Sequence, residues 1–231
     1  MPDSTQKELE NNYIPDSGCF AALLPEEIKF LNKNKSTFVY HRKETVCKEG
    51  GFSSGVKYII DGLVKIYIEG PKNRNIIVKI LGPGDFIGLS SISGSKTYSY
   101  SGAALCDSTV FMINREAIME LIKKNGNFAL EMAEWYCLSY DKAYKKLATI
   151  GFKNQTGRIA DTLLYLNQDK FSDRNVYRYL SRSCIADLAG VPMESAVRIL
   201  SDLDKTRVIE LDKKEIRILD MERLKVFSRQ G

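Results

Sequence analysis

Residues 181–209 constrain the fold most, because they combine two short amphipathic segments with a turn that few residue types permit. Ser181 is a favourable N-cap for a first helix, and Gly190 stands where a helix C-terminus favours positive φ. Pro192 is tolerated in the first turn of a second helix. One side of that helix is apolar, with Ala196, Ile199, Leu200 and Leu203 at helical spacing. The stretch therefore predicts a helix-turn-helix unit.

Two short strand-like runs follow around residues 212–214, and they predict a hairpin wing beside the second helix. A plain helical hairpin has no need of a wing, so the arrangement favours a DNA-binding unit. Glu194 and Arg198 lie four residues apart on the second helix and so share one face. Arginine can donate two hydrogen bonds to guanine, and glutamate can accept one from cytosine N4. The alternative is a solvated Glu–Arg pair of small energetic effect.

Residues 36–113 consist of short β-like runs divided by glycines, which predicts an antiparallel barrel, sandwich or jelly roll. The runs are Thr37–His41, Val56–Ile60, Leu63–Ile68, Ile76–Leu81 and Thr109–Ile113. Asp61-Gly62 predicts a tight hairpin between its flanking runs. The glycine-rich turn at residues 82–88 either lines a small-molecule pocket with its backbone amides or only reverses the chain.

A long helix is predicted from Asn127 to Ile150, since helix-favouring residues dominate and no Gly or Pro interrupts them. A heptad seam along it comprises Ala129, Ala133, Tyr136, Tyr140, Ala143, Leu147 and Ile150. Such a seam favours pairing with a second chain, although a helix packed on its own domain shows a similar stripe. A second apolar set, Phe128, Met132 and Trp135, is expected to pack on the β domain.

The sequence thus predicts an α+β chain in three parts: a β-roll sensor domain over residues 1–125, a dimerisation helix over 126–151 and a DNA-binding domain over 152–231. A loosely held arm is expected at residues 1–17 and a short helix within Cys19–Phe30. Residues 151–154 are the candidate hinge, and they break the long helix. Gln155–Asn167 is predicted to be a helix, and Tyr177–Leu180 a short strand.

The composition excludes several classes of protein. The five cysteines are scattered singly, which indicates reduced thiols and neither a disulfide framework nor a metal cluster. One histidine in 231 residues excludes the usual histidine-rich metal site of a jelly-roll enzyme, so we expect no enzyme and no catalytic residue. No apolar run reaches membrane-spanning length, and no signal peptide is evident, so a cytoplasmic protein is expected.

The order of β-roll, long helix and winged helix-turn-helix resembles the Crp/Fnr family, that of the cAMP receptor protein and the fumarate-nitrate reductase regulator. The matching stretches are residues 82–88, residues 156–160 (T-G-R-I-A), and Gly190 followed by Glu194-x-x-x-Arg198. The resemblance implies a bacterial, homodimeric transcription regulator with double-stranded DNA and RNA polymerase as partners. It places Glu194 and Arg198 at base-reading positions, with Met193 where a polar residue is frequent and Ser195 beside them. Arg182 and Ser183 become candidate phosphate contacts.

The candidate effector pocket departs from the cAMP-binding pattern of that family. The pocket comprises Gly84, Phe86, Gly88, Leu89, Tyr98 and Ser99. Leu89 stands where those members have a ribose-binding glutamate, and Tyr98 replaces an arginine that neutralises phosphate. Binding of cAMP is therefore disfavoured.

Two other cofactors of the family are also disfavoured. An iron-sulfur cluster would need grouped N-terminal cysteines, and only Cys19 is present there. A haem group would need an axial ligand, and His41 is the sole histidine. The effector is an unknown small molecule. The competing interpretation is a small-molecule sensor that acts through protein contact.

Overall fold

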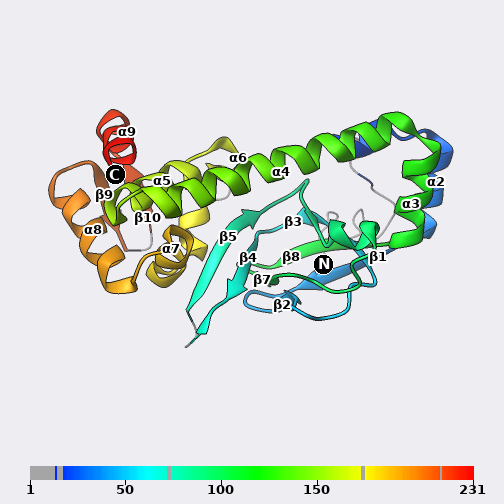
Figure 1. Ribbon diagram of the computed structural model, residues 1–231, viewed down its shortest axis with the longest axis horizontal. Helices are drawn as coiled ribbons and strands as arrows, with labels where there is room; N and C mark the ends of the chain where they lie inside the picture. Colours follow the sequence, from blue (N-terminus) through cyan, green and yellow to red (C-terminus); the bar gives the residue numbers. More distant parts are fainter. Residues whose placement is uncertain (1–13, 15–17, 72–73, 173–174, 214) are drawn as a thin grey trace, which may run out of the picture. The chain divides into compact units, whose positions relative to one another are not determined.

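The computed structural model describes residues 14, 18–71, 74–172, 175–213 and 215–231, and they form two compact units. The first unit extends to Val64 and includes Leu81–Tyr140; the second comprises Lys65–Ile80 and Asp141–Gly231. Figure 1 shows the elements of both. Ile14 excepted, the predicted N-terminal arm over residues 1–17 lies outside the described residues.

The strands form two four-stranded sheets and a two-stranded wing. The first sheet has the order β1 (Lys35–Tyr40), β8 (Ser108–Asn114), β3 (Gly55–Asp61) and β6 (Phe86–Ile87), and its neighbouring strands are antiparallel. The second sheet has the order β2 (Thr45–Cys47), β7 (Ser101–Ala104), β4 (Val64–Glu69) and β5 (Asn75–Leu81). The predicted antiparallel β fold is confirmed, although β2, β6 and β7 are too short to have shown a periodic pattern.

The prediction of a tight hairpin at Asp61-Gly62 is wrong, because β3 and β4 belong to different sheets. The glycine is required for another reason. Gly62 has a φ of 93°, and a Cβ on it would lie 2.2 Å from Oγ of Ser108 and 2.5 Å from its Cα. The turn therefore serves to carry the chain from one sheet to the other against the backbone of Ser108.

An aromatic cluster forms the core between the first sheet and the helices of the first unit. The helical elements here are η1 (Gly18–Ala22), α2 (Pro25–Lys33), η3 (Leu89–Ser93), α3 (Arg115–Lys124) and the start of α4 (Gly126–Phe152). Phe20 lies 4.7 Å from Tyr58 between ring centres, and Phe128 is fully buried beside it. Met132 is buried, and Trp135 meets the ring of Phe86 edge-on at 5.4 Å. The predicted packing of this apolar set is confirmed.

The end of α4 differs from the prediction. Gly151 remains helical and the helix continues to Phe152, so the break falls at Lys153-Asn154. An internal glycine costs about 1 kcal/mol relative to alanine, which destabilises a helix without ending it. Asn154 instead starts the next helix, since its side chain accepts a hydrogen bond from the Gly157 amide at 3.0 Å.

The second unit contains the predicted helix-turn-helix and its wing. Beyond α4, its elements are α5 (Gln155–Leu166), α6 (Asp169–Ser172), η4 (Val176–Tyr179), α7 (Arg182–Ala189), α8 (Met193–Lys205), β9 (Ile209–Asp212), β10 (Glu215–Ile218) and α9 (Met221–Gln230). The predicted strand at Tyr177–Leu180 is wrong, because η4 covers most of it. Asn175 enters this turn with a φ of 41°, and the buried Tyr177 hydroxyl donates to the Leu163 carbonyl at 3.4 Å.

We predict that Gly62→Ala lowers the free energy of unfolding by about 2–5 kcal/mol, since a Cβ adds a backbone clash to the strain of positive φ. Gly94→Ala is the matched control. Gly94 has a φ of 108° with nothing within 4 Å of an added Cβ, so only the strain of about 1–2 kcal/mol is expected. Urea unfolding of both variants tests this prediction, and equal losses would contradict the close approach to Ser108.

Candidate nucleic-acid interface

The turn between α7 and α8 has the geometry that the sequence predicts. Ser181 caps α7, and its hydroxyl accepts a hydrogen bond from the Cys184 amide at 3.1 Å. Gly190 ends the helix with a φ of 65°, and the next amide, that of Val191, donates back to the Ala186 carbonyl at 3.0 Å. This left-handed cap satisfies the last carbonyls of α7 and sets the direction of α8.

Helix α8 buries one side and exposes the other. Ala196, Ile199, Leu200 and Leu203 are all buried, and α8 packs on α7 and α5. Pro192 is the N-cap residue and not part of the first turn, a shift of one position from the prediction. Met193, Glu194 and Arg198 are exposed, whereas Ser195 is half-buried. Neither Glu194 nor Arg198 forms a hydrogen bond or ion pair with another described residue, so their charged groups are available to a ligand.

The two candidate phosphate contacts lie at the start of α7, and both are half-buried. The Arg182 guanidinium donates to the backbone carbonyl of Lys213 in the wing turn at 3.4 Å, and partial burial lowers its pKa. Arg182 thus connects α7 to the wing, which the sequence did not predict. Ser183 lies beside it on the first turn of α7.

The wing is the antiparallel pair β9 and β10, whose register joins Asp212 to Glu215. Lys213 has a φ of 49°, as a tight turn requires. The Glu215 carboxylate accepts from Arg178 at 3.3 Å and from Asn175 at 3.0 Å, and these hydrogen bonds lower its pKa. The wing is thereby held to the turn that precedes α7.

A polar network fixes the C-terminal end of α4 to this unit. Lys153 pairs with the Asp161 carboxylate at 2.8 Å, and Thr149 donates to the same carboxylate at 2.9 Å. Ser228 of α9 also donates to Asp161. The Arg158 side chain joins the Lys153 carbonyl, at 2.8 Å, to the Gly190 carbonyl, at 3.3 Å. The residues predicted as a hinge are therefore tied to α5 and α9.

Most of the predicted seam of α4 is exposed. Ala133, Tyr136, Tyr140, Ala143 and Leu147 are exposed, and Ala129 and Ile150 are half-buried. The Ile150 side chain packs against Gly190: a Cβ added to Gly190 would lie 3.6 Å from Cγ1 of Ile150. Helix α4 also exposes large apolar residues that are not part of the predicted heptad seam, namely Leu130, Leu138, Tyr144 and Phe152.

The candidate effector pocket is filled by the chain's own side chains. Tyr98 is buried, and a Cβ on Gly88 would lie 2.9 Å from its ring. The Lys57 ammonium, on a residue only 5% exposed, donates to the Tyr98 hydroxyl at 2.7 Å. The Gly88 amide donates to the Tyr100 hydroxyl at 2.9 Å, and burial raises the pKa of Tyr100 to about 12. The Gly88 amide, one of the groups that could have lined a pocket, is thus already hydrogen-bonded within the chain.

The other predicted pocket residues surround this contact. Gly84 and Gly88 have φ values of 89° and 79°, and Phe86 is buried in β6. Leu89 is half-buried and Ser99 is exposed. Sequence reasoning missed Lys57 and Tyr100; the available signal was a lysine within the otherwise apolar run V-K-Y-I-I of β3.

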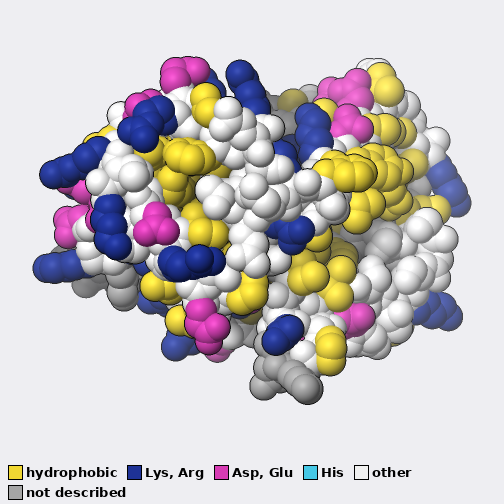
Figure 2. Space-filling model, turned by 60° about the vertical axis from the view of Figure 1, so that its left-hand side comes forward, with side chains coloured by type: hydrophobic (Ala, Val, Ile, Leu, Met, Phe, Trp, Pro, Cys, Tyr) yellow, Lys and Arg dark blue, Asp and Glu magenta, His cyan; other side chains and the backbone are white. Residues whose placement is uncertain are grey.

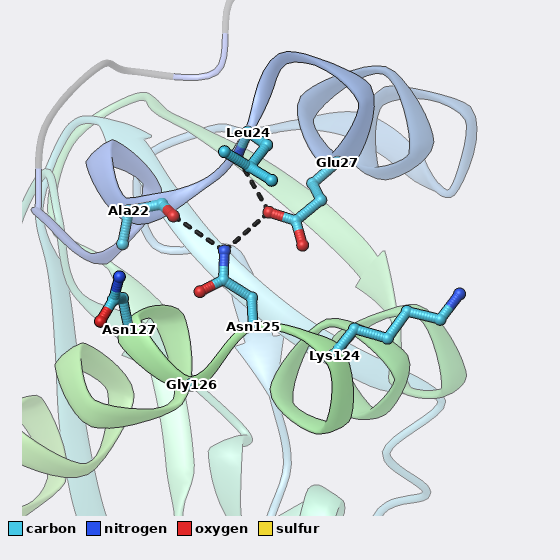
Figure 3. Close-up of a pocket in the computed structure, with 7 residues that line it drawn as sticks. All are labelled: Ala22, Leu24, Glu27, Lys124, Asn125, Gly126 and Asn127. Atoms are coloured by element: carbon cyan, nitrogen blue, oxygen red, sulfur yellow. Dashed lines mark hydrogen bonds between the residues drawn. The ribbon is translucent and has the colours of Figure 1, made fainter.

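A separate hollow lies where α3 meets α4 (Figure 3). The Asn125 amide donates to the Ala22 carbonyl at 2.8 Å and to the Glu27 carboxylate at 2.7 Å. Glu27 also accepts from the Leu24 amide at 2.9 Å. Asn125, Glu27 and the two backbone groups thus bond to one another and join the helices at this hollow.

The described part of the chain contains neither a candidate metal cluster nor a membrane-spanning helix. No group of three or more His, Cys, Asp or Glu side chains there could hold a metal ion. No described helix is long and apolar enough to cross a membrane.

Basic and acidic side chains are interspersed on the face that Figure 2 shows, and apolar side chains reach the surface between them. The formal net charge of the whole chain is only +5. A strong, uniform positive field is therefore absent from that face, and tight DNA binding would depend on specific contacts more than on non-specific attraction.

Two family models match the chain, one over the β domain and one over the helix-turn-helix. Residues 37–125 match the cyclic nucleotide-binding domain family, and residues 157–227 match the Crp-like helix-turn-helix domain family. A CRP-like cAMP-activated global transcriptional regulator of Mycobacterium tuberculosis is 27% identical over 213 residues, covering 90% of this chain and 95% of the relative. The cAMP-activated global transcriptional regulator CRP of Salmonella typhimurium is 26% identical over 181 residues, covering 77% and 86%.

The fold has solved counterparts. FixK2 from Bradyrhizobium japonicum superimposes with a TM-score of 0.75 at 20% identity, covering 84% of this chain and 96% of that one. A cyclic-nucleotide-binding type of β domain, a long helix and a winged helix-turn-helix define a DNA-binding transcription regulator. The chain belongs to the Crp/Fnr family.

We predict that the chain binds neither cAMP nor cGMP with a dissociation constant below about 10 μM. Leu89 cannot accept from a ribose hydroxyl, and Tyr98 and Tyr100 already occupy the Gly88 turn. Titration calorimetry with each nucleotide is the measurement. Tighter binding would show that both tyrosines move aside and that other groups replace the missing glutamate and arginine.

Proposed function

We propose that the protein is a homodimeric, effector-responsive transcription regulator that reads a palindromic operator with α8. The observation that carries the proposal is that Glu194 and Arg198 are exposed, and bond to no other described residue, on a helix whose opposite side is buried. In this proposal residues 1–125 bind the effector, residues 126–151 form the dimer contact and residues 152–231 bind DNA. The protein acts in the cytoplasm.

Base reading rests on the chemistry of two side chains. Arg198 donates its two guanidinium hydrogen bonds to O6 and N7 of a guanine, and Glu194 accepts from a cytosine N4 in the same groove. Ser195 is half-buried beside Glu194, and Ser183 and Arg182 bond to phosphate oxygens from the start of α7. RNA polymerase is the proposed protein partner.

Dimerisation is proposed through α4, whose exposed side carries Tyr136, Tyr140 and Leu147. The rings of Tyr136 and Tyr140 lie 5.0 Å apart and form a continuous apolar surface. A two-fold reader needs two copies of α8 to reach half-sites one helical turn apart, and a coiled-coil pairing of α4 supplies that symmetry.

Effector response is proposed through the β-roll, with an unidentified small molecule as the signal. Because Tyr98 and Tyr100 occupy the Gly88 turn, an effector at this place would have to displace at least one of them. Displacement of Tyr98 would free the Lys57 ammonium as a hydrogen-bond donor, and displacement of Tyr100 would free the Gly88 amide.

We predict that Arg198→Ala loses about 1–3 kcal/mol of binding free energy on an operator selected from random duplexes and much less on random DNA. Arg182→Gln is the backbone-contact control, because glutamine can still donate to the Lys213 carbonyl. It should weaken both DNAs alike and reduce the slope of binding against salt by about one. Fluorescence anisotropy at several salt concentrations is the measurement. Equal losses for Arg198→Ala on both DNAs would reduce Arg198 to a phosphate contact.

We predict that the double change Ala133→Glu with Ala143→Glu yields monomers, since it places like charges across the two-fold axis. Both alanines are exposed, so their replacement should leave the fold of one chain intact. Ala148→Glu, an exposed position of α4 outside the seam, is the control and should remain dimeric. Sedimentation equilibrium distinguishes the two states, and a dimer in the double variant would exclude this seam.

A further inference from the structure

Helix α8 exposes two large apolar side chains next to its charged pair. Met193 is 55% exposed and Val197 is 46% exposed, whereas the other apolar residues of the helix are Ala196, Ile199, Leu200 and Leu203. Those four are buried on the opposite side. About half of the surface of Met193 and of Val197 is therefore left uncovered by its own unit.

The geometry of a helix places this pair in a strip parallel to the charged one. Met193 and Val197 are four residues apart, as are Glu194 and Arg198, and each apolar residue directly precedes a charged one. At about 100° of rotation per residue, Val197 also lies close to Glu194, its third neighbour along the helix. A ligand that touches Glu194 and Arg198 thus meets Val197 at the same depth.

Helix propensity alone does not favour valine at position 197. Valine is a weaker helix former than alanine, lysine or glutamate because its χ1 freedom is restricted. An exposed apolar strip that continues a charged interface is suited to an apolar group on the same partner. In the major groove of ordinary duplex DNA, that group is the C5-methyl of thymine.

We propose that Met193 and Val197 read thymine through its 5-methyl group, at base pairs adjacent to those read by Glu194 and Arg198. The inference rests on the proposed function, in which α8 enters the major groove. It assigns the half-site a composition: a guanine and cytosine contacted by the charged strip, flanked by thymines contacted by the apolar strip. Met193, which lacks a hydrogen-bond donor, contributes to specificity by contact with a methyl group.

The test replaces thymine by deoxyuridine, which removes the methyl group and leaves the base-pair hydrogen bonds unchanged. An operator is first selected from random duplexes with the full chain. Each thymine of both half-sites is then replaced, one symmetric pair at a time, and the affinity is measured by anisotropy. We expect at least one pair of replacements to weaken binding by about threefold to fivefold per methyl group.

The variants Met193→Ala and Val197→Ala identify the contact. Each should bind the thymine operator more weakly than the unchanged chain does, and at least one should bind the thymine and deoxyuridine operators equally. Arg198→Ala is the control: it should lose affinity overall but keep its sensitivity to the methyl group.

Three results would overturn the inference. If no deoxyuridine replacement lowers the affinity for the operator, α8 contacts no thymine methyl group, and the proposed function is unaffected. If the replacements matter equally for the unchanged chain and both alanine variants, other residues contact the methyl groups. If no operator is selected at all, the proposed function fails, and the inference fails with it.

Discussion

The helix-turn-helix of α7 and α8 depends on the burial of one side of α8. Ala196, Ile199, Leu200 and Leu203 pack on α7 and α5, and a buried aliphatic side chain of this size contributes about 1.5–3 kcal/mol. Since this packing fixes the rotation of the helix about its axis, it also fixes which residues face outward. The left-handed cap at Gly190 sets the direction in which α8 leaves α7. The position of Arg198 therefore follows from this cap and from apolar contacts that Arg198 itself does not make.

The same separation between framework and ligand chemistry holds in the β-roll. The glycines at residues 84 and 88 keep the positive φ that the turn requires, so the fold of a cyclic-nucleotide-binding domain is retained. The groups that would face a nucleotide are different, because phenol oxygens of Tyr98 and Tyr100 accept from Lys57 and Gly88. Family membership therefore identifies the architecture, whereas the ligand has to be inferred from these side chains.

Sequence reasoning succeeded where one local pattern decides the structure. The N-cap at Ser181, the cap at Gly190 and the apolar side of α8 each depend on residues within a few positions of one another. It failed where distant contacts decide. Asp61-Gly62 has the sequence of a hairpin turn, yet Gly62 is needed because its backbone lies against Ser108. Tyr177 was predicted to lie in a strand, yet it lies in a 3-10 turn from which its hydroxyl donates to the Leu163 carbonyl. Tyr100 and Lys57 likewise meet their partners only in the folded sheet.

Selection of DNA from a random duplex library by the full chain tests the central claim most directly. If two copies of α8 read one groove face, the enriched sequences will be inverted repeats whose half-sites lie about 10–10.5 base pairs apart between their centres, each with a guanine in a fixed position. Enrichment of a single, unrepeated site would contradict the two-fold arrangement. A library that remains random after repeated selection at moderate salt would contradict base reading by α8 altogether.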